Sequence, residues 1–199
     1  ERARGAGVSD FEMDFWQDCG NTFHEEQKQI VAARRMGLYP IMGGAHPPSF
    51  DLQGRTVCDI GGGPVSLLLK CVNRGGCVVV DPGQFPKWVV QRYEECGIMF
   101  WNGKGEEIDI EGVAHFDDAW IYNCLQHVDD PVRVIKNARA IATNIRLFEW
   151  IDIEPYDGHP HMLTKELLDE ALGSPGFSSE VNEDGAVGRA YYGVFMTAS

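Results

Sequence analysis

Hydrophobic and polar positions follow two different rhythms along residues 55–151. Short, almost wholly apolar runs are separated by segments in which apolar residues recur every three or four positions. Runs of the first kind predict strands buried on both faces, and segments of the second kind predict helices packed on a sheet. The predicted strands are TVCDI (56–60), CVVV (77–80), IMFW (98–101), AWIY (119–122) and IRLFEWI (145–151). The predicted helices run from Pro64 to about Arg74, from about Phe85 to Cys96, and from Pro131 to about Ala142.

This alternation predicts a doubly wound, Rossmann-like α/β fold with a mostly parallel sheet. The C-terminal part differs, because a helix over 163–172 is followed by a weak strand near 177–181 and a strand over 188–199. Two strands in succession predict an antiparallel hairpin at one edge of the sheet.

The N-terminal part predicts helix rather than strand. Residues 10–38 show helical spacing, and the Gly- and Pro-rich stretch 37–54 is typical of a connection. The apolar marks of the helical part are Phe11, Phe15, Phe23, Ile30 and Ala33. We therefore expect a helical cap and connection over 1–54 and a core over 55–199. Segment 14–29, which contains Trp16, fits either a lid over a ligand site or an amphipathic helix with a solvated face.

Composition narrows the class of protein. The chain has 199 residues and a formal net charge of −13, with no cluster of Lys and Arg, so it should repel nucleic acid and anionic lipid. No apolar run is long enough to cross a bilayer, and the first residues lack the apolar region of a signal peptide. Six cysteines without a CxxC pair favour a reducing cytoplasm. We expect one hydrophobic core, no membrane partner and no nucleic-acid partner.

A glycine turn between two acids carries the strongest chemical signal. Gly61, Gly62 and Gly63 follow the first predicted strand of the core and let the backbone approach a ligand closely. Asp81 ends the next strand, where a carboxylate can accept both hydroxyls of a ribose. The spacing predicts a nucleoside-containing cofactor at the carboxyl ends of these strands.

Two cofactor classes fit a glycine turn followed by an acid. A nicotinamide dinucleotide needs a third glycine where this chain has Ser66, and Pro64 and Val65 crowd the place of the pyrophosphate. Asp59, before the turn, has no role in that fingerprint but could hold a cationic amino group. S-adenosylmethionine carries an aminoacyl group on a nucleoside, so it fits better.

Four motifs in the right order resemble those of class I S-adenosylmethionine-dependent methyltransferases across roughly residues 55–150. They are VCDIGGGP (57–64), VVVDP (78–82), WNGKGEEIDI (101–110) and FDDAWIYNCLQHVDDPVRVIKNA (116–138). The closing helix and strands are compatible with the family's seven-stranded sheet, whose seventh strand is inserted antiparallel. The resemblance implies S-adenosylmethionine as the cofactor.

The resemblance also implies roles for individual residues. Gly61 and Gly63 would border the methionine and ribose portions, with Asp59 beside the amino group, and Asp81 would hold the ribose. Gly105 and Glu106 would edge the adenine, while Asn123 and Cys124 would contact the methionyl part. Lys104 stands where many members have an acid for the adenine amine, and Glu107 is a possible substitute.

His127 is the candidate catalytic base, because it follows the fourth motif's strand near the place where the methyl group should point, and an imidazole can take a proton near neutrality. A structural role in the turn is the alternative. The loop after residue 151 gathers Asp152, Glu154, Asp157, His159 and His161. Its spacing matches no metal motif, so we predict no metal and interpret the loop as part of the rim of an acceptor pocket.

These observations predict a methyltransferase that acts on a small-molecule or sugar-like acceptor, more readily at oxygen than at nitrogen. Two alternatives remain at this point: a nicotinamide-dependent oxidoreductase, and a non-catalytic module that binds S-adenosylmethionine. The sequence does not identify the acceptor or the oligomeric state.

Overall fold

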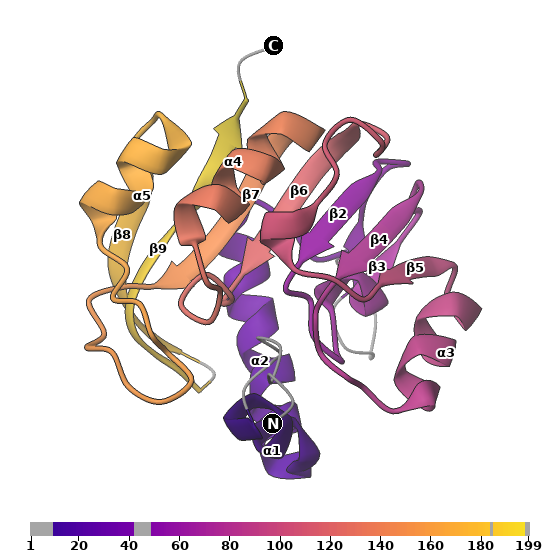
Figure 1. Ribbon diagram of the computed structural model, residues 1–199, viewed down its shortest axis with the longest axis horizontal. Helices are drawn as coiled ribbons and strands as arrows, with labels where there is room; N and C mark the ends of the chain where they lie inside the picture. The colour runs from indigo at the N-terminus through magenta and orange to yellow at the C-terminus, as the bar shows by residue number, and fades with distance from the viewer. Residues whose placement is uncertain (1–9, 42–48, 184, 198–199) are drawn as a thin grey trace, which may run out of the picture.

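One seven-stranded sheet organises the computed structural model, which describes residues 10–41, 49–183 and 185–197 (Figure 1). In spatial order the strands are β5 (Ile98–Trp101), β4 (Cys77–Val80), β2 (Val57–Ile60), β6 (Phe116–Tyr122), β7 (Ala142–Trp150), β9 (Ala186–Met196) and β8 (Phe177–Glu183). Pairs from β5 to β7 are parallel, and β9 is antiparallel to both β7 and β8. The predicted fold class and C-terminal hairpin are confirmed. The start of the chain and the middle of the predicted connection, 42–48, lie outside the described residues.

The order of the strands creates the site. Strands β2 and β4 are buried at all four positions, which explains why their sequences are continuously apolar. From β2 the chain adds β4 and β5 on one side, and it then adds β6 and β7 on the other side. The carboxyl ends of β2 and β6 therefore border the point where strand order reverses, which is where ligands bind in open α/β sheets.

Helices cover both faces of the sheet. Figure 1 views it from the face that α4 (Pro131–Ile141) and α5 (Lys165–Leu172) cover, and their apolar residues share one hydrophobic cluster with the strands. Asp130 and Thr164 cap these two helices through side-chain oxygens that accept the backbone N–H groups of Arg133 and Leu167. The other cluster contains residues of α2 (Cys19–Arg35) and α3 (Lys87–Glu95).

The N-terminal segment forms two helices, α1 (Asp10–Gln17) and α2, as the prediction of N-terminal helices requires. At the break, Asp18 Oδ1 accepts the backbone N–H of Asn21 at 3.2 Å. Past the end of α2, Arg146 on β7 donates to the carbonyl of Met36 at 2.8 Å and pairs with buried Asp118 at 2.9 Å. Apolar residues of α2 pack in the same cluster as the strands, so no separate core lies before residue 55 in the described part. None of the described helices has the length and apolar character needed to cross a bilayer.

The prediction of a helix from Pro64 to about Arg74 is wrong. The segment makes a single 3-10 turn, η1 (Leu67–Lys70), and then strand β3 (Cys71–Val72), which pairs with β1 (Phe50–Asp51). The Arg74 guanidinium donates to the carbonyls of Leu68 and Cys71, at 2.9 and 2.6 Å, and so satisfies acceptors that a longer helix would have used. The apolar run LLLKCV would show the same hydrophobic pattern in a helix as in a 3-10 turn followed by a strand, so the pattern does not distinguish the two.

Candidate cofactor and acceptor site

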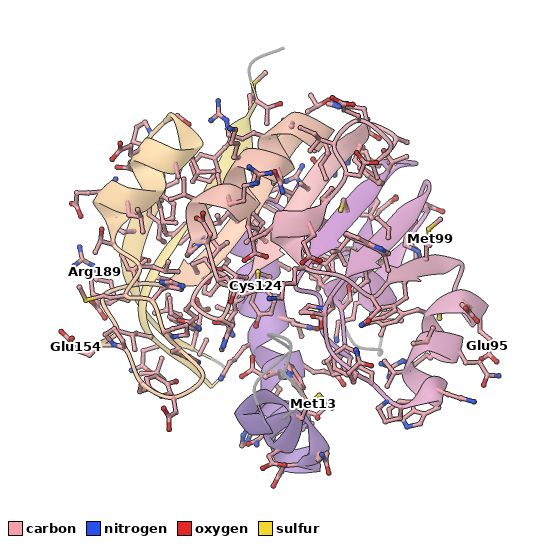
Figure 2. All side chains as sticks on the ribbon, in the orientation of Figure 1. Met13, Glu95, Met99, Cys124, Glu154 and Arg189 are labelled. Atoms are coloured by element: carbon pink, nitrogen blue, oxygen red, sulfur yellow. The ribbon has the colours of Figure 1, made fainter. Side chains whose placement is uncertain are left out.

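A cavity of about 600 Å³ lies at the carboxyl ends of the central strands. This volume is in the range of small-molecule sites. Figure 2 shows Cys124, one of its lining residues, near the middle of the molecule above the N-terminal helix that carries Met13. Eight of the ten residues predicted for the site line the cavity: Gly61, Gly63, Asp81, Gly105, Glu106, Asn123, Cys124 and His127.

The glycine turn after β2 forms the floor of the cavity. Gly61 has a φ of +74°, and a Cβ at this position would overlap the side chain of Cys124. Gly63 has a φ of +60°, and a Cβ there would meet the ring of Trp16 at 3.6 Å. Both positions favour glycine because their conformation is left-handed, and at Gly61 a Cβ would also overlap Cys124, whereas the Trp16 contact at Gly63 is an ordinary one.

Asp81 holds this turn from the end of β4. Its Oδ2 accepts the backbone N–H of Gly63 at 2.9 Å, and its Oδ1 accepts the backbone N–H of Gly83 at 2.8 Å. The carboxylate is buried yet borders the cavity. Two backbone amides thus orient the carboxyl group, so an acceptor of hydrogen bonds is organised at this strand end.

Asp59 does not border the cavity; it lies under the turn, where its Oδ2 accepts the hydroxyl of Ser66. Burial raises the pKa of Asp59 to about 7, the Ser66 hydrogen bond lowers it, and the charge of Asp81 raises it further. Gly62 is not a lining residue either, and a Cβ on it would meet Asp59 Oδ2 at 2.6 Å. Asp59 and Ile60 point to opposite faces of the sheet, and of these two residues only Ile60 borders the cavity.

Two loops are tied together on the side predicted for adenine. Glu106, in the short 3-10 turn η2 (Gly105–Glu107), accepts the backbone N–H groups of Asp129 and Asp130 through Oε1, at 2.8 and 3.1 Å. Lys104 pairs with the Asp129 carboxylate at 2.6 Å, and this hydrogen bond raises the pKa of the lysine. Glu107 is exposed and outside the cavity, whereas Lys104 lines it. The loops after β5 and β6 thus form one wall.

The end of β6 brings Asn123 and Cys124 to the cavity. Asn123 has a φ of +49°, and its N–H donates to the carbonyl of Phe148 at 2.9 Å. The thiol of Cys124 donates to the carbonyl of Ile60 at 3.3 Å, which joins the end of β6 to the end of β2. Burial raises the pKa of this thiol well above its usual value, so it packs as a neutral group.

His127 lines the cavity beside the loop that follows β7. Its Nδ1 is 2.6 Å from the carbonyl oxygen of Gly158. A carbonyl only accepts hydrogen bonds, so Nδ1 carries the proton, and in the neutral ring Nε2 carries the lone pair. The ring stands edge-on to His159, with centroids 4.3 Å apart, and His159 in turn stacks on Tyr156 at 4.3 Å.

The same loop supplies the rim that its position predicts. Residues 156–160 all line the cavity, together with Trp150 at the end of β7. From the N-terminal helices come Phe15, Trp16, Glu25 and Lys28, as the lid interpretation of this segment predicts. No group of three or more His, Cys, Asp or Glu side chains in the described part of the chain is arranged to share a metal ion.

Sequence reasoning missed Trp150, which lines the cavity, and Glu149, a further buried acid. Trp150 ends the apolar run of β7, where its side chain cannot be distinguished from core by pattern. Glu149 was visible as the one acid in LFEWI, but the backbone groups that it contacts are 24 and 25 residues away in sequence.

Comparison with known proteins gives fold-level matches. No protein-family model matches the chain, and no curated protein matches it in sequence. Among solved structures it is similar to 1,6-didemethyltoxoflavin-N1-methyltransferase of Burkholderia thailandensis with bound 1,6-didemethyltoxoflavin and S-adenosylhomocysteine, at 17% identity over 100% of this chain and 94% of that chain, with a TM-score of 0.58.

Two further structures extend the comparison. Magnesium protoporphyrin IX methyltransferase from Synechocystis PCC 6803, with bound S-adenosylhomocysteine, is 12% identical over 94% of this chain and 95% of that chain, with a TM-score of 0.60. The [4+2]-cyclase SpnF is 16% identical over 81% and 62% of the two chains, with a TM-score of 0.54. Identities this low compare folds, and the first motif, strand order and antiparallel last strand agree with that comparison. The chain has the fold of the class I S-adenosylmethionine-dependent methyltransferases.

Proposed function

We propose that the protein is an S-adenosylmethionine-dependent methyltransferase that methylates a small-molecule or sugar-like acceptor, at a hydroxyl oxygen. The observation that carries the proposal is the pairing of two groups in one cavity. Asp81 brings a buried carboxylate to the cavity beside the glycine turn, and His127 brings an imidazole to the lining of the same cavity. Two of the structural neighbours contain S-adenosylhomocysteine, the product of such a transfer.

The residues of the turn fit this cofactor. Gly61 and Gly63 line the cavity without side chains, so a ligand can approach their backbone closely, and the Asp81 carboxylate suits a pair of ribose hydroxyls. Asn123 and Cys124 would border the methionyl part, and Gly105 with Glu106 would border the adenine. When bound, S-adenosylmethionine supplies a methyl group activated by a positive sulfur. The task of the protein is then to align the acceptor and remove its proton.

The chemistry of the acceptor half supports a neutral acceptor. Both lysines that line the cavity are ion-paired, Lys28 with Glu25 and Lys104 with Asp129, each at 2.6 Å. Acidic Asp157 also lines it, so a carboxylate or phosphate on the acceptor would meet no unpaired lysine or arginine in the described lining. Trp150 and Tyr156 offer flat apolar surfaces on which a planar or sugar ring can pack.

His127 would act as the general base. Its Nδ1 proton is held by the Gly158 carbonyl, so in the neutral ring Nε2 is the atom that would accept the proton of an acceptor hydroxyl as the methyl group is transferred. The Gly158 carbonyl also stabilises the imidazolium that results.

Calorimetric titration of the purified chain with S-adenosylmethionine, S-adenosylhomocysteine and NAD tests the cofactor. Micromolar binding of the two sulfur nucleosides without NAD supports the proposal, whereas binding of NAD alone would favour an oxidoreductase. Release of S-adenosylhomocysteine with a panel of hydroxylated acceptors then separates an enzyme from a module that only binds. A cofactor-binding chain that turns over none of the panel, and in which His127→Ala changes nothing, would be such a module.

A further inference from the structure

Glu149 is a buried acid that the proposed transfer does not use. Its side chain has no exposed surface, and its strand β7 is otherwise apolar from Leu147 to Trp150. Burying a carboxyl group costs free energy unless hydrogen bonds compensate. The group therefore needs a structural or functional reason to be there.

The side-chain hydrogen bonds of Glu149 to the described residues go to the turn that leaves β6. Its Oε1 accepts the backbone N–H groups of Cys124 and Leu125, at 2.9 and 3.0 Å. Its Oε2 is buried and makes no hydrogen bond to the described residues. One oxygen atom thus satisfies two consecutive buried amides, which would otherwise be left unpaired.

The turn held in this way joins the two halves of the cavity. It begins at Asn123 in a left-handed conformation, with a φ of +49° that is unfavourable for a residue with a side chain. It continues to His127, whose N–H donates to the carbonyl of Cys124 at 3.0 Å. Cys124 borders the cofactor half and His127 the acceptor half, so a shift of this turn would misalign both.

We propose that Glu149 is the positioning residue of the site, because its Oε1 fixes the 123–127 turn and thereby the distance between the cofactor and His127. This inference rests on the proposed function. The required property is a hydrogen-bond acceptor at Oε1, and the negative charge is secondary.

The pKa of Glu149 is consistent with the acceptor atom mattering more than the negative charge. Burial raises the pKa of Glu149 to about 7, while the Leu125 and Cys124 amides and nearby His127 lower it. Tyr122 and Cys124 also lie close, and burial keeps both neutral by raising their pKa values. A protonated Glu149 keeps a carbonyl oxygen that accepts both amides, so either form can hold the turn.

Three variants separate the acceptor atom from the charge and from bulk. Glu149→Gln keeps an acceptor oxygen, Glu149→Leu keeps the approximate volume only, and Asp118→Asn alters another fully buried carboxyl, which pairs with Arg146 outside the cavity. We expect E149Q to bind S-adenosylhomocysteine within about threefold of wild type, E149L about thirtyfold or more weakly, and D118N like wild type despite a lower Tm.

Hydrogen exchange of the amides of residues 124 and 125 gives a readout that needs no acceptor. In wild type and E149Q these amides should exchange slowly, and in folded E149L they should exchange at least tenfold faster while the strand β2 amides stay protected. Equal protection in E149L, or equal loss of binding in E149Q and E149L, overturns the inference. If E149L does not fold, E149Q decides: weakened binding with faster exchange at these two amides refutes the acceptor role, and retention of both supports it. Failure of wild type to bind S-adenosylhomocysteine would instead refute the proposed function, and the exchange result would still stand.

Discussion

The carboxylate of Asp81 and the backbone of Gly63 are joined by a 2.9 Å hydrogen bond, so the end of β4 supports the glycine turn that follows β2. One acid thereby shapes the floor of the cavity and offers its charge to whatever lies on that floor. The site depends on this pair before any ligand is present.

Asp81→Ala should weaken the binding of S-adenosylmethionine by about 2 to 3 kcal/mol, because charge-assisted hydrogen bonds to the ribose are lost. Calorimetry measures this directly. Asp51→Ala is the matched control, since Asp51 also accepts a turn amide, that of Gln53 at 2.8 Å, but lies outside the cavity. Unchanged affinity in D81A would contradict the ribose assignment.

His127→Ala should slow turnover about a hundredfold or more and leave cofactor affinity unchanged, because the base is removed without a cofactor contact. The exposed His115, which lies outside the cavity, provides the control variant His115→Ala. Normal turnover in H127A would exclude His127 from the mechanism.

Gly61→Ala should destabilise the fold by more than Gly54→Ala. Both glycines have positive φ, +74° and +82°, so both variants incur a conformational cost of about 1 kcal/mol. Only at Gly61 would the new Cβ also overlap Cys124, whereas nothing lies within 4 Å at Gly54. We expect a further loss of about 1 to 3 kcal/mol in G61A, measured by denaturant unfolding. Equal losses would mean that the turn yields without cost.

Asp59→Asn should change the pH dependence of stability. Burial raises the pKa of Asp59 from 3.8 to about 7, so between these pH values the unfolded chain releases a proton that the folded chain keeps. Stability from this group is full below about pH 4 and falls as pH rises towards 7, by an amount on the order of 4 kcal/mol. Unfolding free energies from pH 4 to 8 should therefore fall less steeply in D59N than in wild type.

Asp117→Asn should change the pH dependence of stability in the opposite direction to Asp59→Asn. Hydrogen bonds from the backbone N–H and hydroxyl of Thr56 lower the pKa of this exposed acid, so its contribution to the stability of the folded chain is lost as pH falls.

Parallel pH profiles for wild type and D59N would contradict the prediction for Asp59, because they would show that Asp59 ionises normally in the folded protein.

The parallel sheet could be predicted because its strands are buried on both faces, so their sequences are continuous apolar runs. The structure of the segment after Pro64 could not be predicted, because LLLKCV suits a helix as well as a 3-10 turn and strand. The strand forms because Phe50 and Asp51, which are distant in sequence, pair with Cys71 and Val72. Local pattern determines an element only where tertiary contacts do not compete.

Some residues of the site could likewise be predicted from the sequence, and others could not. Residues at strand ends, such as Asp81 and Cys124, were placed correctly at the cavity because strand ends converge by topology. Asp59 does not line the cavity, because it is buried under the turn and bound to Ser66, and its predicted role beside the amino group of the cofactor stays a prediction. The contact of Glu149 with two amides depends on backbone geometry that no residue pattern encodes.

The division of the cavity between two sources bears on how such proteins diverge. In the proposed division, strand ends and their glycine turn would hold the cofactor, and the N-terminal helices and residues 156–160, which line the same cavity, would contact the acceptor. Changes in those peripheral segments would leave the register of the sheet untouched, so a new acceptor pocket would not require new strand ends. Solved structures named for 1,6-didemethyltoxoflavin and for magnesium protoporphyrin IX are similar to this chain at 17% and 12% identity. Directed evolution of acceptor specificity should therefore begin in the periphery.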